Sequence, residues 1–345
     1  MFKDILNKCV LGETLTELEA EMIMNEIMSG NASQSQIASL ISILRFRGET
    51  ADELVGFAKA MRSHMIQVDY EDDAVIDTCG TGGDGASTFN ISTTASIILS
   101  SLGVKVAKHG NRAFTSNSGS ADVLEQLGIT IQNTPEEAKR SLNEYNMSFL
   151  FAPAYHSSMR HAAVPRKDVG FRTIFNLLGP ISNPANCKYQ LIGVYDTRPA
   201  ERMAETLRRL GSKKVLLVTG RDGLDECSIT TETDVVELNQ GRITRRTITP
   251  EDFGMKRGTL DEIRVSSVEE SAYVLENVLA GKGNPSQTNI VLLNAGAGLY
   301  AAEKCKSIEE GVELARVAIK EGDALNQLTK LRNLNQVIKE KQHYA

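Results

Sequence analysis

The sequence predicts an α/β protein, with an N-terminal helical bundle domain and a larger C-terminal α/β domain built on a mainly parallel central sheet. Its 345 residues exceed the size at which one hydrophobic core usually stops growing, so two domains, or one large α/β domain with an appendage, are expected. Residues 1–70 show the apolar spacing of helices, whereas short β-branched runs alternate with helical segments from residue 74 onwards. We therefore expect a helical domain at 1–70 and an α/β domain at 71–345.

The first domain is expected to hold three helices, because three capping boxes each open a helical segment. The boxes are Thr16 with Glu19, Ser33 with Gln36, and Thr50 with Glu53. Apolar side chains after Ser33 and Thr50 recur on one helical face, as a small bundle requires.

Five short β-branched runs, at 75–76, 104–107, 148–151, 191–194 and 215–219, predict the strands of the parallel sheet. Between the third and fourth strands, 172–178 reads as a helix, and we expect 165–185 to rejoin the helical domain. The runs 234–238 and 242–248, with a turn at 239–241, predict a hairpin that can run antiparallel to the other strands. Helices near 267–280, 307–321 and 324–337 are expected to close the domain.

Composition and charge exclude several classes of protein. The net charge of -6 comes from acidic and basic residues scattered along the chain, which leaves no basic surface for a nucleic acid. The five cysteines lie far apart without a CxxC pair, which fits neither a zinc cage nor a disulfide framework. Residues 1–11 lack the pattern of a secretory signal, and no apolar stretch reaches the roughly 20 residues that cross a bilayer. A cytoplasmic protein with free thiols is expected.

A glycine-rich loop follows the first strand and carries the sequence Gly80-Thr81-Gly82-Gly83-Asp84-Gly85. Backbone N–H groups approach a phosphate closely only where no Cβ intervenes, and the helix expected at 92–102 would add the partial positive charge of its N-terminus. The loop alone fits a tight turn without a ligand equally well. The hydroxyl and amide side chains at 90–94 favour a phosphate site, because helix capping explains only one of them. The spacing matches neither a Walker loop nor a dinucleotide fingerprint.

A second polar loop follows the second strand, with two cations and several hydroxyls at 108–112 and 115–120. Loops at the carboxyl ends of neighbouring parallel strands converge on one crevice, so this loop is expected to face the glycine loop across a shared ligand. The alternative is a solvated surface turn.

Taken together, the segments 80–84, 90–93, 108–112 and 118–122 resemble the motifs of the anthranilate phosphoribosyltransferase family. The resemblance spans the chain and includes 48–50, 166–184 and 222–226. It implies a magnesium-dependent pentosyltransferase of tryptophan biosynthesis, which moves the phosphoribosyl group of phosphoribosyl pyrophosphate (PRPP) to the amine of anthranilate. It also implies a homodimer joined through the helical domains, with PRPP bound between the two domains.

The resemblance implies site residues by position. Those expected around PRPP are Gly80, Gly83, Asp84, Thr88, Asn90, Ile91, Ser92, Thr93, Lys108, His109, Gly110, Asn111, Arg112, Ala113, Phe114, Thr115, Ser116 and Ser120. Those expected around anthranilate are Gly80, Asn111 and Arg166. Magnesium is expected on Ser92, Asp225 and Glu226. The family pattern departs at Phe114, Thr115 and Asn117, which puts donor affinity in question more than reaction type.

Chemical arguments support the metal and acceptor assignments. Adjacent carboxylates at Asp225 and Glu226 repel unless they are solvated or neutralised, and hard oxygen ligands suit Mg²⁺ bridged by a pyrophosphate. Without the family context, a solvent-facing acidic turn is the favoured explanation of this pair, because Asp-Glu pairs are common on protein surfaces. The Arg166 guanidinium offers bidentate recognition of the anthranilate carboxylate.

No catalytic residue is assigned. His109 is a candidate for acceptor contact or proton transfer, although an imidazole beside anionic ligands also serves as a plain hydrogen-bond donor. Tyr155 and His156 are weaker candidates for the same pocket.

Two other functions compete with this one. A pyrimidine nucleoside phosphorylase would need no pyrophosphate-bound magnesium, so Asp225, Glu226, Asn111 and Arg166 argue against it. A non-catalytic nucleic-acid-binding relative would require a basic surface and eroded motifs, and the sequence has neither.

Overall fold

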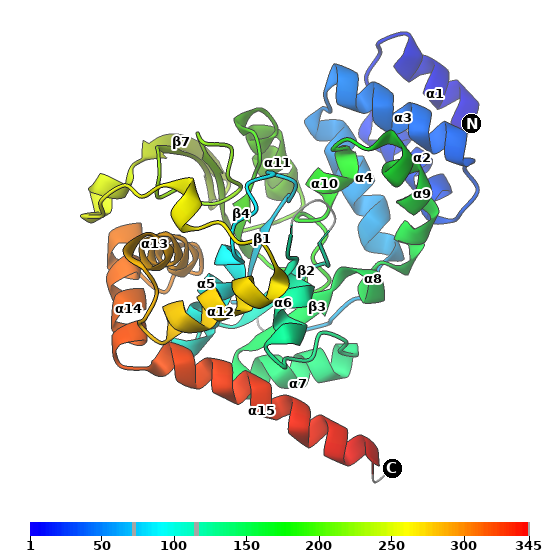
Figure 1. The fold of residues 1–345 in the computed structure, drawn as a ribbon. Helices are drawn as coiled ribbons and strands as arrows, with labels where there is room; N and C mark the ends of the chain where they lie inside the picture. The colour runs from blue at the N-terminus through cyan, green and yellow to red at the C-terminus, as the bar shows by residue number, and fades with distance from the viewer. Residues whose placement is uncertain (71–73, 114–116, 344–345) are drawn as a thin grey trace.

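The computed structural model describes residues 1–70, 74–113 and 117–343, with side chains through residue 333. A helical bundle packs beside a larger α/β part (Figure 1). The strands are β1 (Ile76–Gly80), β2 (Val106–Gly110), β3 (Met147–Phe151), β4 (Tyr189–Gly193), β5 (Lys214–Gly220), β6 (Thr233–Asn239) and β7 (Arg242–Ile248). The α-helices are α1 (Phe2–Val10), α2 (Glu17–Met28), α3 (Gln34–Arg47), α4 (Ala51–His64), α5 (Ile91–Ser101), α6 (Ser120–Gln126), α7 (Pro135–Tyr145), α8 (Ala152–Tyr155), α9 (Arg160–Val169), α10 (Ile174–Leu178), α11 (Thr197–Arg209), α12 (Val268–Leu279), α13 (Pro285–Ala301), α14 (Ile308–Lys320) and α15 (Asp323–His343).

The bundle begins with a helix that the capping-box criterion missed. α2, α3 and α4 start at the three predicted boxes, and each box forms both of its reciprocal hydrogen bonds. The preceding helix α1 has Met1 at its N-cap, and that side chain makes no capping hydrogen bond. Residues 1–70 therefore form four helices, one more than the three that were predicted. Helices α7, α11 and α13 were also not predicted.

The sheet has the order β3-β2-β1-β4-β5-β6-β7. Strands β1 to β5 pair in parallel, and β6 and β7 pair antiparallel as a hairpin. The predicted fold class is confirmed. The hairpin turns at Gln240 and Gly241, whose φ angles of 47° and 82° suit the tight turn of a twisted hairpin.

Strand β2 lies further along the chain than predicted. We expected a strand at 104–107 followed by a loop, but the strand runs through Lys108 and His109 to Gly110. Both polar side chains are buried, with 2% of Lys108 and 8% of His109 exposed. The polarity of these two residues predicts a loop, but contacts with residues distant in sequence bury them within the sheet.

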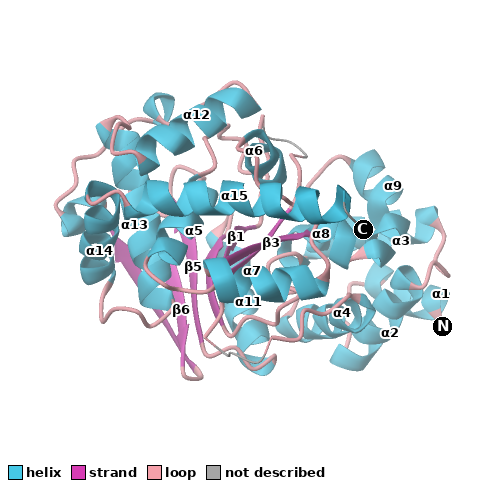
Figure 2. Cartoon of the chain, turned by 90° about the horizontal axis from the view of Figure 1, so that it is seen from below, coloured by secondary structure: helices cyan, strands magenta, loops and turns pink. Residues whose placement is uncertain are grey.

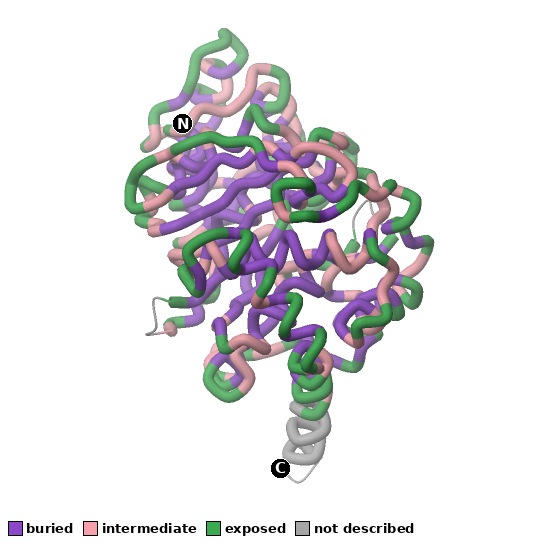
Figure 3. The backbone as a smooth tube through the Cα atoms, turned by 90° about the vertical axis from the view of Figure 1, so that its left-hand side faces the viewer, coloured by how far each residue is buried: buried purple, intermediate pink, exposed green. Residues whose placement is uncertain are grey.

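Alternate side chains of the sheet serve two cores. Leu216 and Val218 of β5 join a core with α5, α12, α13, α14 and α15, while Val215 and Leu217 join a core with α11 and the helical bundle. Figure 2 shows the strands as an inner layer with helices around them, and Figure 3 shows buried segments through the interior of both parts. The helical bundle therefore covers part of one face of the sheet.

Helices α9 and α10 pack with the bundle. Ala162 of α9 and Ile174 and Phe175 of α10 belong to the core that includes α2, α3 and α4. This packing agrees with the prediction that 165–185 rejoins the helical domain. The domain boundaries themselves stay a prediction.

The strand order reverses direction between β1 and β4. The chain passes from β1 outward to β2 and β3, and then returns to β4 on the other side of β1. In open α/β sheets, ligands bind outside the carboxyl ends of the strands at such a switch point. At this end of the sheet, hydrogen bonds join the loops after β2, β4 and β5 to the loop after β1.

Candidate active site

The glycine-rich loop leaves β1 at the switch point with a backbone that needs glycine. Gly82, Gly83 and Gly85 have φ angles of 68°, 75° and 73°, in the left-handed region that L side chains rarely adopt. Gly80, the last residue of β1, pairs with Gly193, the last residue of β4. A Cβ on either glycine would meet Asp225, at 2.4 Å from Oδ2 for Gly80 and 1.5 Å from the carbonyl oxygen for Gly193. The paired glycines therefore make room for Asp225 beside the loop.

The two carboxylates predicted to bind metal accept hydrogen bonds from the backbone of the predicted donor site. The Gly82 N–H donates to Asp225 Oδ2 at 2.8 Å, and the Ser92 N–H donates to Glu226 Oε1 at 3.2 Å. Burial raises the pKa of both carboxyl groups, and each is raised further by a neighbouring carboxylate: Asp84 acts on Asp225, and Asp225 acts on Glu226. Neither forms an ion pair with any residue that the structure describes. The structure thus brings Asp225 and Glu226 to the loop as buried carboxyl groups whose ionised forms a bound cation would stabilise.

These residues fit a magnesium ion shared with a phosphate. Among the described residues, no group of three or more His, Cys, Asp and Glu side chains is arranged to hold a metal ion by itself. Mg²⁺ is commonly held by one or two carboxylates and completes its shell with water and substrate oxygens. Asp225, Glu226 and the Ser92 hydroxyl supply oxygen ligands of that kind.

Lys108 brings a cation to the start of α5. Its Nζ donates to the Thr78 carbonyl at 2.5 Å and to Ser92 Oγ at 3.2 Å. Burial lowers the pKa of Lys108, and the charge of Asp77 opposes this shift. The ammonium group therefore lies beside Ser92, in the first turn of α5.

Residues after the glycine loop are held by a segment that the sequence analysis did not implicate. Asn90 Oδ1 accepts hydrogen bonds from Ser118 and from Ser271 of α12, at 3.0 Å and 2.8 Å. Thr88 forms a β-bridge with Arg264, and Asn117 Nδ2 donates to the Val265 carbonyl at 3.0 Å. No local signal identified Arg264 or Ser271. Asn117, which departs from the family pattern, therefore holds its loop to the backbone of Val265.

The loop after β2 is tied to α6. Arg112 forms ion pairs with Asp122 and Glu125, and the Ala113 N–H donates to Asp122 Oδ2 at 2.9 Å. Ser120 Oγ donates to the Asn111 carbonyl at 3.3 Å. The predicted donor contacts Phe114, Thr115 and Ser116 lie outside the described residues.

Two histidine rings lie next to this loop, tilted by 44° to each other. The rings of His109 and His156 lie 5.1 Å apart, and His109 Nδ1 lies 3.2 Å from the Gly179 carbonyl oxygen. Burial lowers the pKa of His109 to about 3 and that of His156 to about 4. Each Nε2 is buried without a hydrogen-bond partner among the described residues. Both rings are therefore neutral at pH 7. Tyr155 differs, because its hydroxyl donates to the Asn133 carbonyl in a separate core cluster.

Arg166 is a half-buried guanidinium on α9. It lies over the Phe175 ring at 5.2 Å, and burial lowers its pKa. It forms no ion pair with the residues that the structure describes. The structure records no contact between Arg166 and Asn111, so the shared acceptor pocket stays a prediction.

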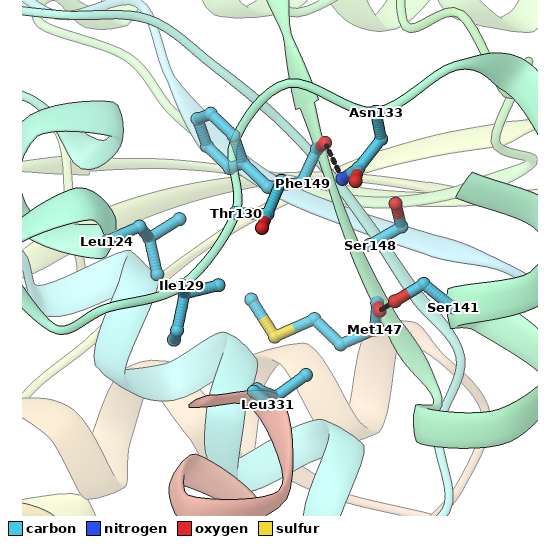
Figure 4. A pocket seen from close by; sticks show the side chains of 9 residues that line it. All are labelled: Leu124, Ile129, Thr130, Asn133, Ser141, Met147, Ser148, Phe149 and Leu331. Carbon is cyan, nitrogen blue, oxygen red and sulfur yellow. Dashed lines mark hydrogen bonds between the residues drawn. The ribbon is translucent and has the colours of Figure 1, made fainter. Parts of the chain in front are cut away.

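Two cavities lie apart from these residues. A small one of about 20 Å³ beside β3 is lined by Leu124, Met147 and Phe149 among others, and has room for a single water (Figure 4). A groove of about 1050 Å³ lies between the α3–α4 connection, α11 and the β6–β7 hairpin, and does not include the glycine loop. Among the described residues, no helix has the length and apolar character needed to span a membrane.

Known proteins show the same pair of domains. Residues 3–65 match the family model "Glycosyl transferase family, helical bundle domain", and residues 72–325 match "Glycosyl transferase family, a/b domain". A Geobacillus sp. (strain WCH70) protein named anthranilate phosphoribosyltransferase is 62% identical over 345 residues, covering 100% of both chains. A relative of that name from Halalkalibacterium halodurans is 56% identical, again over 100% of both chains.

Solved structures agree with these relatives. The Thermus thermophilus anthranilate phosphoribosyltransferase has a TM-score of 0.90 and 39% identity, covering 96% of this chain and 99% of that one. The Saccharomyces cerevisiae enzyme, solved in complex with PRPP and Mg, has a TM-score of 0.88 and 27% identity, covering 97% and 98%. The chain therefore belongs to the glycosyl transferase family that joins a helical bundle to an α/β domain.

Within that family, the chain belongs to the anthranilate phosphoribosyltransferases. The family and the pentosyltransferase class predicted from the motifs are confirmed. Neither the nucleoside phosphorylase nor the nucleic-acid-binding alternative is supported by these relatives.

Proposed function

We propose that this chain transfers the phosphoribosyl group of PRPP to the amine of anthranilate, giving N-(5-phosphoribosyl)anthranilate and pyrophosphate in tryptophan biosynthesis. One observation carries the proposal: the glycine-loop amides, Lys108 and the Asp225–Glu226 pair converge at the carboxyl ends of the strands. A convergence of donors, a cation and carboxylates suits a pyrophosphate that carries a metal ion. The yeast relative solved with PRPP and Mg supports the same donor and metal.

The donor site uses residues from three loops. We assign the pyrophosphate to the amides of the glycine loop and the N-terminus of α5, beside Lys108, with Mg²⁺ on Ser92, Asp225 and Glu226. When bound, Mg²⁺ neutralises charge on the leaving pyrophosphate. Of the other predicted donor residues, Asn90 and Thr93 lie at the start of α5, Asn111 and Arg112 follow β2, and Ser120 begins α6.

The chain contributes positioning and charge to the reaction. Lys108 and the backbone amides stabilise negative charge that grows as the bond between the ribose anomeric carbon and pyrophosphate breaks. The aromatic amine attacks from the opposite face of the ribose and loses its proton afterwards. An arylamine is unprotonated at neutral pH, so no strong general base is needed. His109, with its lowered pKa, is neutral and suited to hydrogen bonding in the acceptor pocket.

The acceptor is assigned to Arg166, Asn111 and Gly80. Arg166 supports this assignment because its guanidinium is partly desolvated and lacks a carboxylate partner among the described residues. A yeast relative solved in complex with 4-fluoroanthranilate shows that an enzyme of this fold takes such a molecule. Arg166→Ala should raise KM for anthranilate by about tenfold to a hundredfold, the value of a charge-assisted bidentate contact, and leave pyrophosphate binding unchanged. Equal loss of affinity for anthranilate and for pyrophosphate would show that Arg166 does not bind the anthranilate carboxylate.

The activity is tested by mixing the protein with anthranilate, PRPP and Mg²⁺ and following the fluorescence of anthranilate. Consumption of the fluorescence, stopped by a chelator and restored by added Mg²⁺, is expected. Fluorescence that persists with all three components present would refute the function.

The assembly is proposed as a cytoplasmic homodimer joined through the helical domains. Exposed apolar side chains on that part of the chain support this interface: Phe46, near the end of α3, is 97% exposed, and Val164 of the neighbouring α9 is 46% exposed. Burying such side chains favours association. Phe46→Arg should shift the protein toward monomer in sedimentation velocity, and an unchanged dimer would remove Phe46 from the interface.

A further inference from the structure

Two carbonyl groups of the glycine loop are held from the side of the helical bundle. Arg172, between α9 and α10, donates from Nη1 to the Gly83 carbonyl at 2.9 Å. Asn176 of α10 donates from Nδ2 to the Thr81 carbonyl at 3.4 Å. The orientation of this amide follows from its other bond, because Asn176 Oδ1 accepts the Thr173 N–H at 3.0 Å. Helix α10 itself packs on α3 and α4, so Asn176 stands on a supported element, and Arg172 lies two residues before its start (Figure 1).

Holding a carbonyl determines where the next N–H points. In a trans peptide unit the C=O and the following N–H point in opposite directions, and the described chain contains no cis peptide. The Thr81 carbonyl points to α10, so the Gly82 N–H points away from it. That N–H indeed reaches Asp225 Oδ2 at 2.8 Å, on the side of the predicted metal and pyrophosphate. By the same geometry, the bond from Arg172 to the Gly83 carbonyl turns the Asp84 N–H away from the bundle.

Arg172 is itself fixed in place. Its guanidinium stacks over the Tyr195 ring at 4.1 Å, and the Tyr195 N–H donates to Thr81 Oγ1 at 3.2 Å. The stack and the carbonyl bond hold the planar group from two directions. A cation on the Gly83 carbonyl also polarises that peptide unit, which makes the Asp84 N–H a stronger donor.

We propose that Arg172 and Asn176 are positioning residues of the donor site: by holding the carbonyls of the same peptide units, they orient the Gly82 N–H toward the metal carboxylate Asp225 and the Asp84 N–H toward the pyrophosphate. The proposal rests on the proposed function for the identity of the donor. Neither side chain needs to touch the substrate. Through them, the helical part of the chain sets the direction of the anion-binding amides in the α/β part.

The test measures pyrophosphate binding, which requires no acceptor and no turnover. Inorganic pyrophosphate is titrated with excess Mg²⁺ into the full chain by calorimetry. Arg172→Gln should weaken binding by about tenfold, the effect of a lost charge-assisted bond, and Asn176→Ala by about threefold. Arg172→Lys keeps the cation and should recover part of the loss. The matched controls are Arg316→Gln, at an exposed arginine paired with Glu313, and Asn277→Ala, at a half-buried asparagine bonded to the Tyr273 carbonyl.

Two further measurements separate orientation from general damage. Steady-state kinetics of Arg172→Gln should show a raised KM for PRPP, with KM for anthranilate within about twofold of wild type, the scatter of an unaffected site. Hydrogen exchange should show Mg-pyrophosphate protecting the amides of Gly82 and Asp84 in wild type, and protecting them less in Arg172→Gln.

The outcomes are distinguishable. Unchanged pyrophosphate affinity in both variants, with wild-type protection of Gly82 and Asp84, would overturn the proposal. Equal increases of both KM values together with a lowered melting temperature would also overturn it, since that pattern reports a structural role. Wild-type protein that binds Mg-pyrophosphate but consumes no anthranilate would refute the proposed function alone.

Discussion

The pairing of Gly80 with Gly193 leads to a specific prediction about the carboxylates that are expected to bind the metal. A Cβ at residue 193 would lie 1.5 Å from the carbonyl oxygen of Asp225 and 2.4 Å from its carbonyl carbon. Both atoms belong to the backbone, which cannot rotate away as a side chain can. At residue 80 the corresponding contact, 2.4 Å from Oδ2, is with the carboxylate end of the side chain. Gly193→Ala should therefore displace the peptide that carries the metal carboxylates, whereas Gly80→Ala should mainly turn one carboxylate.

The size of the effect follows from the distances. Ordinary van der Waals contact begins near 3.4 Å, so the Asp225 carbonyl would have to retreat by about 2 Å. A misplacement of about 1 Å in a reacting geometry costs roughly a hundredfold in rate, and overpacking costs about 1–3 kcal/mol of stability. We expect Gly193→Ala to lose at least about a hundredfold in kcat/KM, and to require more Mg²⁺ for half-maximal rate.

The assay is the initial rate of anthranilate consumption across a Mg²⁺ titration, with thermal unfolding measured in parallel. Gly179→Ala is the matched control, because a Cβ there meets nothing closer than 3.8 Å and the φ of -52° suits alanine. That variant should keep the wild-type Mg²⁺ dependence. A folded Gly193→Ala protein with kcat/KM within about twofold of wild type would refute the reasoning, because Asp225 would then tolerate the displacement.

Two further predictions concern stability. Glu53 is fully buried and accepts hydrogen bonds from Arg47 and from the Leu15 N–H, so Glu53→Ala should lower the free energy of unfolding by about 3–5 kcal/mol in urea denaturation; a loss below about 1 kcal/mol would contradict a structural ion pair. His156 has its pKa lowered by burial from 6.5 to about 4, so the unfolded chain takes up a proton that the native chain refuses. The stability that the native chain gains because His156 stays neutral is fully present above pH 6.5, and it is lost as the pH falls toward 4. Wild type should therefore lose roughly 2–3 kcal/mol more than His156→Gln between pH 7 and pH 4, and parallel pH curves for the two proteins would contradict it.

Local sequence signals predicted much of the fold. The capping boxes at Thr16, Ser33 and Thr50 placed three helix starts correctly, because the groups that satisfy a helix terminus lie within four residues of each other. The hairpin at 233–248 was recognisable for the same reason, since its turn residues and its strands are neighbours in the chain. The helix without a capping side chain, α1, was missed. Strand β2 was displaced because its polar residues are buried by partners distant in sequence.

For the site, the sequence by itself determined which groups are available: a glycine loop after a strand, hydroxyls at a helix start, two adjacent carboxylates, and a lysine expected just after the next strand. These depend on residue type and on short spacings. Only the tertiary structure decided how they face one another. The contact of Asp225 with the Gly82 N–H spans 143 positions, and the bonds of Arg172 and Asn176 to the loop span 89 and 95. Hydrogen bonds act over about 3 Å, so no sequence spacing can indicate partners that the sheet and the helical bundle bring together from so far apart in the chain.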